Sequence, residues 1–155
     1  MVLADPGGPP RIETPRGDRL SASISHSGGA AVAVTASPGL AVGIDLEPRA
    51  RGGPALRDPA LAFGPDEAEA VARLGPLRAW CAKEAAGKAL GTGLTGAPLR
   101  LRLKITASGD PAVLAGAAEL PIRFVAHDRY DIALCVVEAA VARRAADAML
   151  TGVPA

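Results

Sequence analysis

Short runs of small, apolar and polar residues in the first third of the chain predict β-strands. Residues 21–25 alternate small and polar side chains, and residues 30–36 form an apolar run that contains two valines. The glycine pair Gly28-Gly29 between these runs predicts a β-hairpin, because tight hairpin turns need residues that adopt positive φ. We expect a third strand over residues 40–46. Residues 1–19 contain four prolines and three glycines and instead predict an extended arm.

The middle of the chain predicts two helices, which follow a Pro- and Arg-rich exposed loop over residues 48–60. The first helix starts at Pro65 with two acidic residues, which suit the positive end of a helix dipole, and it ends near Gly75. The second spans residues 76–90, because Pro is favoured in a first turn and Gly91 follows as a stop signal.

The last third returns to strands and ends in a helix. Residues 99–106 alternate leucine with arginine or lysine, the period of an amphipathic strand. A second hairpin and a final helix are expected over residues 122–126, 131–137 and 139–150. Because strands, then helices, then strands follow one another, the expected fold class is α+β. We expect one domain over residues 20–150 and a short tail over residues 151–155.

Composition narrows the function classes. The chain has 155 residues and a net charge of +1, so nucleic acid or an anionic membrane is not expected as its main partner. No apolar run reaches ~18 residues and the first ten residues do not resemble a secretory signal, so a cytoplasmic protein is expected. The two cysteines, Cys81 and Cys135, are interpreted as reduced core residues.

Two carboxylates end the strand predicted over residues 40–46. Asp45 and Glu47 are two positions apart, so their side chains lie on the same face. Such like charges repel unless a cation lies between them, and Mg²⁺ is bound through one or two carboxylates together with water and phosphate oxygens. The alternative is that the strand simply ends here, with both side chains in solvent and Pro48 as its stop.

The second helix carries the segment Trp80 to Lys88. Glu84 and Lys88 lie one turn apart on one face, and the neighbouring row (Leu77, Cys81, Ala85 and Ala89) is assigned to the core. A surface pair between Glu84 and Lys88 is the simple alternative. However, only three of the 17 basic residues are lysines, and two of them, Lys83 and Lys88, are here. Gly87 costs about 1 kcal/mol in mid-helix, so its presence indicates close packing against the helix backbone.

The segment Ser25-His26-Ser27 precedes the glycine turn. Hydroxyls, an imidazole and glycine amides could together bind a phosphate group. The alternative is an ordinary hairpin in which serine caps its own turn. No Ser-x-x-Lys or Gly-x-Ser-x-Gly sequence is present, so a nucleophilic serine is not supported.

In their order and spacing, these segments resemble the 4′-phosphopantetheinyl transferases. The matching segments are residues 24–28, 42–47, 80–88, 91–94 and 130–135. The resemblance implies a half-unit of that fold, an antiparallel sheet packed against a long helix. It also implies transfer of the phosphopantetheine arm from coenzyme A to a serine of an apo acyl or peptidyl carrier protein, with Mg²⁺ as cofactor.

The resemblance further assigns roles to individual residues. Asp45, Glu47 and Glu84 are the implied magnesium ligands. Glu84 is also the implied base, and Lys88 stabilises charge on the transferred phosphoryl group. The implied contacts of coenzyme A are Ser25, His26, Asp45, Lys83 and Lys88. Lys83 could instead shape the helix surface or meet the carrier protein.

The chain departs from the family at its N-terminus. Members are either two-half chains of the surfactin-synthetase type or single half-units of the carrier-protein-synthase type that trimerise. This chain has the motifs of the first type but the length of the second. Because the second type completes its fold by trimerising, we expect a homo-oligomer, with a trimer favoured over a dimer. The strand with Leu99, Leu101 and Leu103 or the strand over residues 132–137 would form the contact. Alternatively, the N-terminal arm folds over the open face of the sheet and leaves a monomer.

The same departure affects the coenzyme A site. The family's Gly-Lys/Arg-Pro segment corresponds to Gly8-Pro9-Pro10, where a proline replaces the basic residue. Arg11, Arg16 and Arg19 are expected to substitute for it. A different class of function stays open as the alternative: a non-catalytic module of a larger synthase that binds a carrier protein or a nucleotide, or a structural domain of such a synthase.

Overall fold

A computed structural model describes residues 2–4, 9–50, 58–94 and 98–151. The strands are β1 (Val2–Ala4), β2 (Pro10–Glu13), β3 (Arg19–Ser27), β4 (Ala30–Ala36), β5 (Leu40–Pro48), β6 (Leu101–Ile105), β7 (Pro111–Ala115), β8 (Ala118–Val125) and β9 (Tyr130–Glu138). The α-helices are α1 (Ala68–Leu74), α2 (Pro76–Leu90) and α3 (Ala139–Thr151). Short 3-10 helices are η2 (Pro59–Leu61), η3 (Pro65–Glu67) and η4 (Pro98–Arg100).

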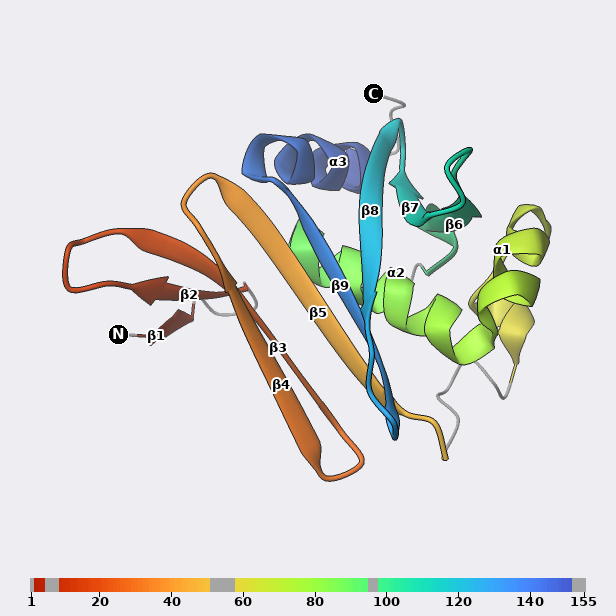
Figure 1. Ribbon diagram of the computed structural model, residues 1–155. Helices are drawn as coiled ribbons and strands as arrows, with labels where there is room; N and C mark the ends of the chain where they lie inside the picture. Colours follow the sequence, from red (N-terminus) through yellow and green to blue (C-terminus); the bar gives the residue numbers. More distant parts are fainter. Residues whose placement is uncertain (1, 5–8, 51–57, 95–97, 152–155) are drawn as a thin grey trace.

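The central layer is a five-stranded antiparallel sheet in the order β5-β9-β8-β7-β6. The long helix α2 lies across one face of this sheet, and α3 packs beside it at one end (Figure 1). The fold is therefore α+β, with an antiparallel sheet packed against a long helix, as the sequence predicts.

Gly43 allows α2 to approach β5 closely. A side chain at this position would overlap the carbonyl oxygen of Ala85 and the backbone nitrogen of Ala89. The helix therefore rests directly on the backbone of β5. Gly87 has the corresponding role on the helix, because a Cβ there would lie 2.8 Å from the carbonyl oxygen of Gly93. The expectation of close packing at Gly87 is confirmed.

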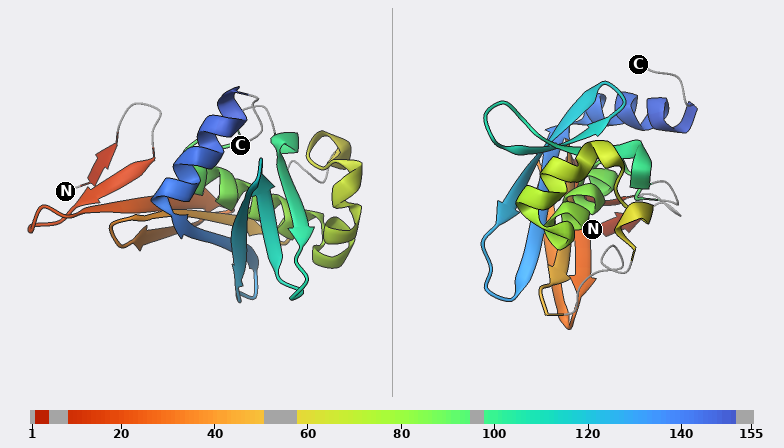
Figure 2. Two further views of the ribbon diagram at one scale, coloured as in Figure 1. Left: turned by 90° about the horizontal axis from the view of Figure 1, so that it is seen from above. Right: turned by 90° about the vertical axis from the view of Figure 1, so that its right-hand side faces the viewer.

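A second sheet, in the order β1-β2-β3-β4, lies against the other side of β5. It projects from one end of the molecule, as the view from above shows (Figure 2). The β3–β4 hairpin turns at Gly28-Gly29, which have φ of 58° and 83°, as predicted. Val32 and Val34 of β4 pack against a small cluster on the outer face of the central sheet, which comprises Ile44, Leu46, Tyr130 and Ile132.

Serines of β3 form hydrogen bonds with the edge of β5 that has no neighbouring strand in the central sheet. Ser23 Oγ accepts a hydrogen bond from the backbone N–H of Ile44 (3.0 Å), and Ser21 Oγ donates one to the carbonyl oxygen of Leu40 (2.8 Å). Side chains of the second sheet thus provide hydrogen-bond partners for backbone groups at this edge of the central sheet.

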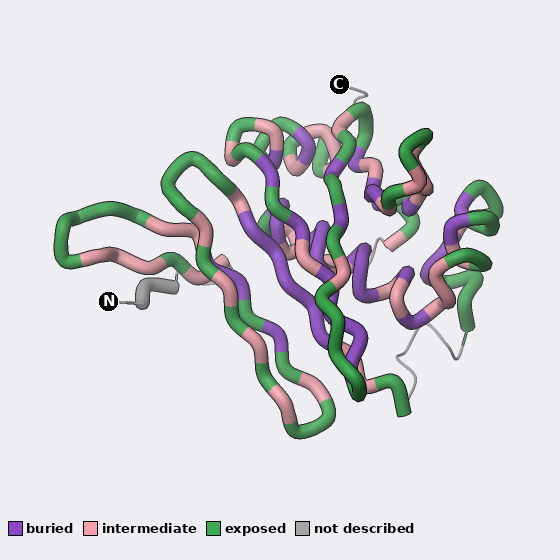
Figure 3. The backbone as a smooth tube through the Cα atoms, viewed as in Figure 1, coloured by how far each residue is buried: buried purple, intermediate pink, exposed green. Residues whose placement is uncertain are grey.

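The main core lies between α2 and the central sheet and is built from small side chains. Five alanines of α2 are at most 6% exposed, and buried residues follow β5, β9 and α2 in Figure 3. Cys81 and Cys135 are both free and fully buried, which confirms their interpretation as reduced core residues. No described helix is long and apolar enough to cross a membrane.

Several boundaries differ from the sequence predictions. The extended arm expected over residues 1–19 is wrong in part, because β2 pairs with β3 through Arg11–Ser21 and Glu13–Arg19. Strand β7 occupies a stretch to which the sequence pattern assigned no structure. Leu101 and Leu103 face the protein's own core at 0% and 1% exposure, so they are not available for a contact between subunits. Residues 51–57 of the expected loop, Gly8 and residues 152–155 of the tail lie outside the described residues.

Candidate active site

Asp45 and Glu47 lie near the end of β5 on the face that meets α2. They alternate with Ile44 and Leu46, which point to the outer cluster, and they share the face of Gly43. The carboxylate of Asp45 is almost fully buried, with a residue exposure of 4%. The expectation that these carboxylates are simply solvated at a strand end is therefore wrong for Asp45.

Lys88, in the last turn of α2, pairs with Asp45. Its Nζ lies 2.7 Å from Asp45 Oδ1. The pair crosses the interface between helix and sheet, so Lys88 is not simply the surface partner of Glu84. Gly43 makes this geometry possible, because it brings the last turns of α2 onto β5.

Glu84 is half-buried one turn before Lys88. Its side chain forms no hydrogen bond or ion pair with the described residues. Burial, together with the charge of Asp45, raises the pKa of Glu84 to about 7, and the charge of Lys88 opposes this shift. Burial also raises the pKa of Glu47, against the hydrogen bond from Ser27. The charges of Asp45 and Lys88 therefore act on both Glu47 and Glu84.

The donor set suits a hard divalent cation. Asp45 Oδ2 is buried and has no hydrogen-bond partner in the described structure, which is costly for a carboxylate oxygen. A cation would satisfy this oxygen, and Mg²⁺ needs only one or two protein carboxylates because it retains water. Within the described ranges, no three acidic, histidine or cysteine side chains are grouped closely enough to form a complete metal site. Asp45, with Glu47 and Glu84 near it, is therefore the candidate position for such a cation.

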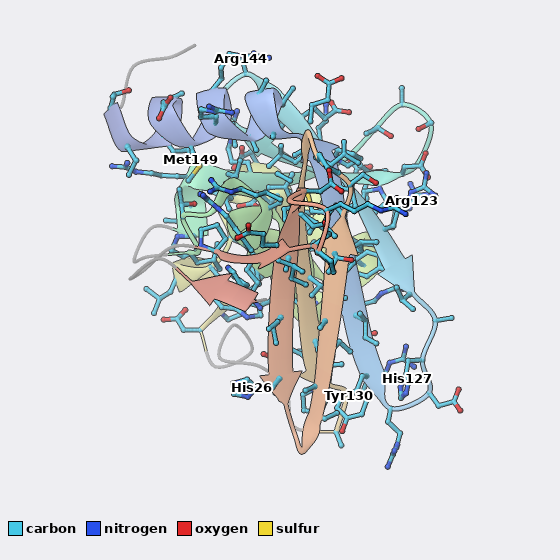
Figure 4. The ribbon with its side chains drawn as sticks, turned by 90° about the vertical axis from the view of Figure 1, so that its left-hand side faces the viewer. His26, Arg123, His127, Tyr130, Arg144 and Met149 are labelled. Carbon is cyan, nitrogen blue, oxygen red and sulfur yellow. The ribbon has the colours of Figure 1, made fainter. Side chains whose placement is uncertain are left out.

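Ser25 and Ser27 contact the carboxylates, whereas His26 does not. Ser25 Oγ donates a hydrogen bond to Asp45 Oδ1 (2.8 Å), and Ser27 Oγ donates one to Glu47 Oε2 (3.0 Å). Because neighbouring residues of a strand face opposite sides, His26 is exposed on the other face, at the end of the hairpin (Figure 4). The sequence expectation grouped Ser25 and His26 around one phosphate, but the structure separates them.

Lys83 does not belong to this site. Its ammonium group is fully buried and lies 2.7 Å from Glu67 Oε1, and it also donates to the carbonyl oxygens of Ala62 (2.6 Å) and Pro98 (3.2 Å). The structure contradicts all three expected roles, which were contact with coenzyme A, a place on the helix surface and contact with the carrier protein, because no part of this side chain reaches solvent. Burial lowers its pKa, and the hydrogen bond with Glu67 opposes that shift.

Glu67 is the partner that the sequence pattern missed. It lies in η3, where its acidic character was attributed to the helix dipole. Its carboxylate also accepts hydrogen bonds from the backbone N–H groups of Gly64 (2.7 Å) and Leu103 (2.7 Å). The scarcity of lysine singled out Lys83, but a lone buried lysine in a sequence does not identify its partner.

An arginine pair lies beyond Glu47, around the buried carboxylate of Asp131. Arg49 Nε lies 3.1 Å and Arg78 Nε 3.8 Å from Asp131 Oδ1. A cavity of about 380 Å³ is lined in part by these three residues together with Gly75 and Pro76. The grouping of these three residues was not predicted, because they lie in a loop, a helix and a strand that are far apart along the chain.

The arginines that were expected to replace the family's basic coenzyme A contact lie on β2, on β3 or between these strands. Arg11, Arg16 and Arg19 are all exposed. The ring of Pro9 lies close to Gly91, which follows the last turn of α2 that carries Lys88. The N-terminal segment therefore passes the Lys88 end of the site.

Comparison with known proteins agrees with these motifs. No curated protein matches the chain. Among solved structures, the crystal structure of holo-[acyl-carrier-protein] synthase from Neisseria meningitidis aligns with 63% of this chain and 97% of that chain, at 19% identity and a TM-score of 0.48. A sequence profile described as the 4′-phosphopantetheinyl transferase superfamily matches residues 41–135, the segment that contains Asp45, Glu47, Glu84 and Lys88. The chain therefore belongs to the 4′-phosphopantetheinyl transferase superfamily.

Proposed function

We propose that the chain transfers the 4′-phosphopantetheine arm of coenzyme A to a serine of an apo acyl or peptidyl carrier protein. The serine oxygen forms a bond to the phosphorus atom that carries the arm. The bond from that phosphorus to the bridging oxygen breaks, and adenosine 3′,5′-bisphosphate leaves. Such a reaction requires a base, in-line positioning and neutralisation of charge.

Glu84 is the proposed base. A carboxylate with a pKa of about 7 and no fixed partner among the described residues can accept the proton of a serine hydroxyl at neutral pH. Glu84 lies one turn from Lys88, so the proposed base and the lysine ammonium group lie along one row of α2. Lys88 supplies positive charge to the phosphoryl oxygens, while its contact with Asp45 holds the ammonium group in place.

Asp45, with Glu47 and Glu84 beside it, is the proposed site for Mg²⁺. When bound, Mg²⁺ neutralises negative charge on the diphosphate. Asp45 contributes its unpartnered oxygen, and Ser25 and Lys88 hold the other oxygen of the same carboxylate. Asp45 and Lys88 are therefore the proposed protein groups nearest the diphosphate of coenzyme A.

The remaining assignments are also proposals. His26 and the exposed arginines Arg16 and Arg19 are available to bind the 3′-phosphate of coenzyme A. A cytoplasmic homo-oligomer, with a trimer favoured, remains the proposed form of the protein. Of the expected contact surfaces, Leu101 and Leu103 are buried, whereas Leu99 and the part of β9 around Val136 are exposed and remain available.

The observation that carries the proposal is the raised pKa of Glu84 beside the Asp45–Lys88 pair. The test is release of adenosine 3′,5′-bisphosphate, measured by chromatography, with and without apo carrier protein. We expect release only when coenzyme A, Mg²⁺ and the carrier are all present, and loss of release in Glu84→Gln. The matched control is Glu138→Gln, an exposed glutamate at the end of β9, which should retain full release.

A further inference from the structure

We infer that Ser25 and Ser27 are positioning residues that orient the carboxylates of Asp45 and Glu47 for a divalent cation. The inference refines the proposed function, since it rests on the same acidic site. It assigns to these serines a role different from contact with a phosphate of coenzyme A. Their hydroxyls act through the carboxylates and need not touch the substrate.

The direction of the Ser25 hydrogen bond is fixed by its surroundings. The backbone N–H of Leu46 donates to Ser25 Oγ (3.3 Å), so this oxygen acts as an acceptor on that side. Its own proton then points to Asp45 Oδ1, 2.8 Å away. The serine is 7% exposed, so water does not compete freely for either bond.

Ser25 and Lys88 together occupy one oxygen of Asp45. Both contact Oδ1, at 2.8 and 2.7 Å, and Oδ2 is left buried without a partner. Two donors on the same oxygen define the rotation of the carboxylate group. They present the second oxygen as the free ligand, as hydrogen-bonded carboxylates commonly do in metal sites.

Ser27 repeats this arrangement two residues further along the strand. Its hydroxyl donates to Glu47 Oε2 (3.0 Å), and Ser27 and Glu47 are both partly buried. Ser25 and Ser27 share a face of β3, just as Asp45 and Glu47 share a face of β5. The spacing of two therefore matches each serine with one carboxylate.

Ser23 provides a matched control within the same strand. Like Ser25, it is buried and accepts a backbone N–H bond from β5, that of Ile44 (3.0 Å). No hydrogen bond from Ser23 to a carboxylate is found in the described part of the chain. A comparison of Ser23→Ala with Ser25→Ala therefore isolates the bond from Ser25 to Asp45, because both variants lose a similar contact between the sheets.

The experiment measures Mn²⁺ binding by electron paramagnetic resonance of the free ion, in the absence of coenzyme A. We expect Ser25→Ala to weaken Mn²⁺ binding by about 10-fold or more, and Ser27→Ala to weaken it less, since loss of a hydrogen bond to a metal ligand commonly costs about 10- to 100-fold. Ser25→Thr, which keeps the hydroxyl, should restore binding. Ser23→Ala should bind Mn²⁺ as the wild type does, and thermal unfolding verifies that each variant is folded.

Equal Mn²⁺ affinity in Ser25→Ala and the wild type would overturn the inference, as would equal weakening in Ser23→Ala and Ser25→Ala. Failure of Ser25→Thr to recover binding while folded would also count against it. These outcomes are separate from the proposed function. If the wild type binds Mn²⁺ in the expected pattern but releases no adenosine 3′,5′-bisphosphate, the positioning role stands and the proposed reaction falls. If the wild type transfers the phosphopantetheine arm but the serine variants bind Mn²⁺ normally, the proposed reaction stands and the positioning role falls.

Discussion

Lys88 Nζ lies 2.7 Å from Asp45 Oδ1, and this ion pair joins the last turns of α2 to β5. The lysine side chain is 27% exposed and the aspartate side chain 6%. One partner is therefore accessible to an incoming phosphate group, whereas the other is held inside. The pair places a cation, a buried carboxylate oxygen and the raised-pKa carboxyl of Glu84 in one region.

Replacement of Lys88 tests its role in the reaction. If Lys88 stabilises charge in the transition state, Lys88→Ala should lower kcat by about 10²- to 10³-fold, with a smaller change in KM for coenzyme A. Lys88→Arg keeps the charge but alters the geometry of the contact with Asp45, so it should recover part of the rate. Steady-state kinetics of both variants provides the measurement. A change confined to KM would mean that Lys88 only binds the substrate.

Glu84 should make the stability of the metal-free protein depend on pH. Its pKa rises from the ordinary value of 4.5 to about 7 on folding, so between these values the folded state binds more protons than the unfolded state. Stability should therefore fall as pH rises from about 4.5 to 7. Urea unfolding in a chelator, at several pH values, should show a flatter dependence for Glu84→Gln than for the wild type. Identical slopes would contradict the raised pKa.

Gly43 should tolerate no side chain. Gly43→Ala places a methyl group against the backbone of α2, so we expect a loss of about 1–3 kcal/mol or more in the free energy of unfolding. Transfer activity should fall too, since Asp45 would separate from Lys88. Ala31→Val, which adds bulk on the exposed face of β4, is the control and should stay within about 0.5 kcal/mol of the wild type. A fully stable and active Gly43→Ala would show that α2 does not depend on this contact.

Lys83 should matter for stability and not for coenzyme A. Lys83→Met leaves the charge of Glu67 buried without its partner, which typically costs about 3–5 kcal/mol. Lys104→Met breaks the exposed pair with Glu119 and should cost less than about 1 kcal/mol. Chemical unfolding compares the two. If the folded Lys83→Met enzyme shows a raised KM for coenzyme A at unchanged stability, Lys83 is a substrate contact after all.

Much of the fold could be predicted from local patterns. The helix over residues 76–90 was predicted at the observed bounds, because proline and glycine mark its two ends. The two-glycine turn and the α+β order were also correct. The strand β2 could not be predicted, since its proline-rich sequence resembles a linker and its pairing with β3 is long-range. Strand β7 was not predicted either, because its short apolar run has no clear periodicity.

The candidate site was predicted less completely than the fold. Spacing along one strand identified Asp45 and Glu47, and spacing along one helix identified Glu84 and Lys88. The contact between Lys88 and Asp45 could not be read from either element, because it depends on how closely the helix approaches the sheet at Gly43. The burial of Lys83 was missed because its partner, Glu67, comes from another part of the chain.

The oligomeric state is a separate prediction. We expect light scattering at micromolar concentration to report a particle larger than the 15.5 kDa monomer, with a trimer favoured. The β3–β4 hairpin already covers Ile44, Leu46 and Ile132, so of the two expected surfaces the exposed parts are the outer face near Val136 and Leu99, and we test the first. Val136→Glu should then reduce the particle mass. A monomeric wild type that transfers phosphopantetheine would refute a site shared between subunits.

The most direct test of the central claim is the intact mass of an apo carrier protein after incubation with coenzyme A, Mg²⁺ and this protein. We predict that the carrier gains the mass of one phosphopantetheine arm, and that replacement of its acceptor serine by alanine prevents the gain. Asp45→Asn, which keeps the shape of the side chain but removes its charge, should leave the carrier unmodified. An unchanged carrier mass with the folded wild-type protein, across several apo acyl and peptidyl carriers, would contradict the proposed transfer reaction.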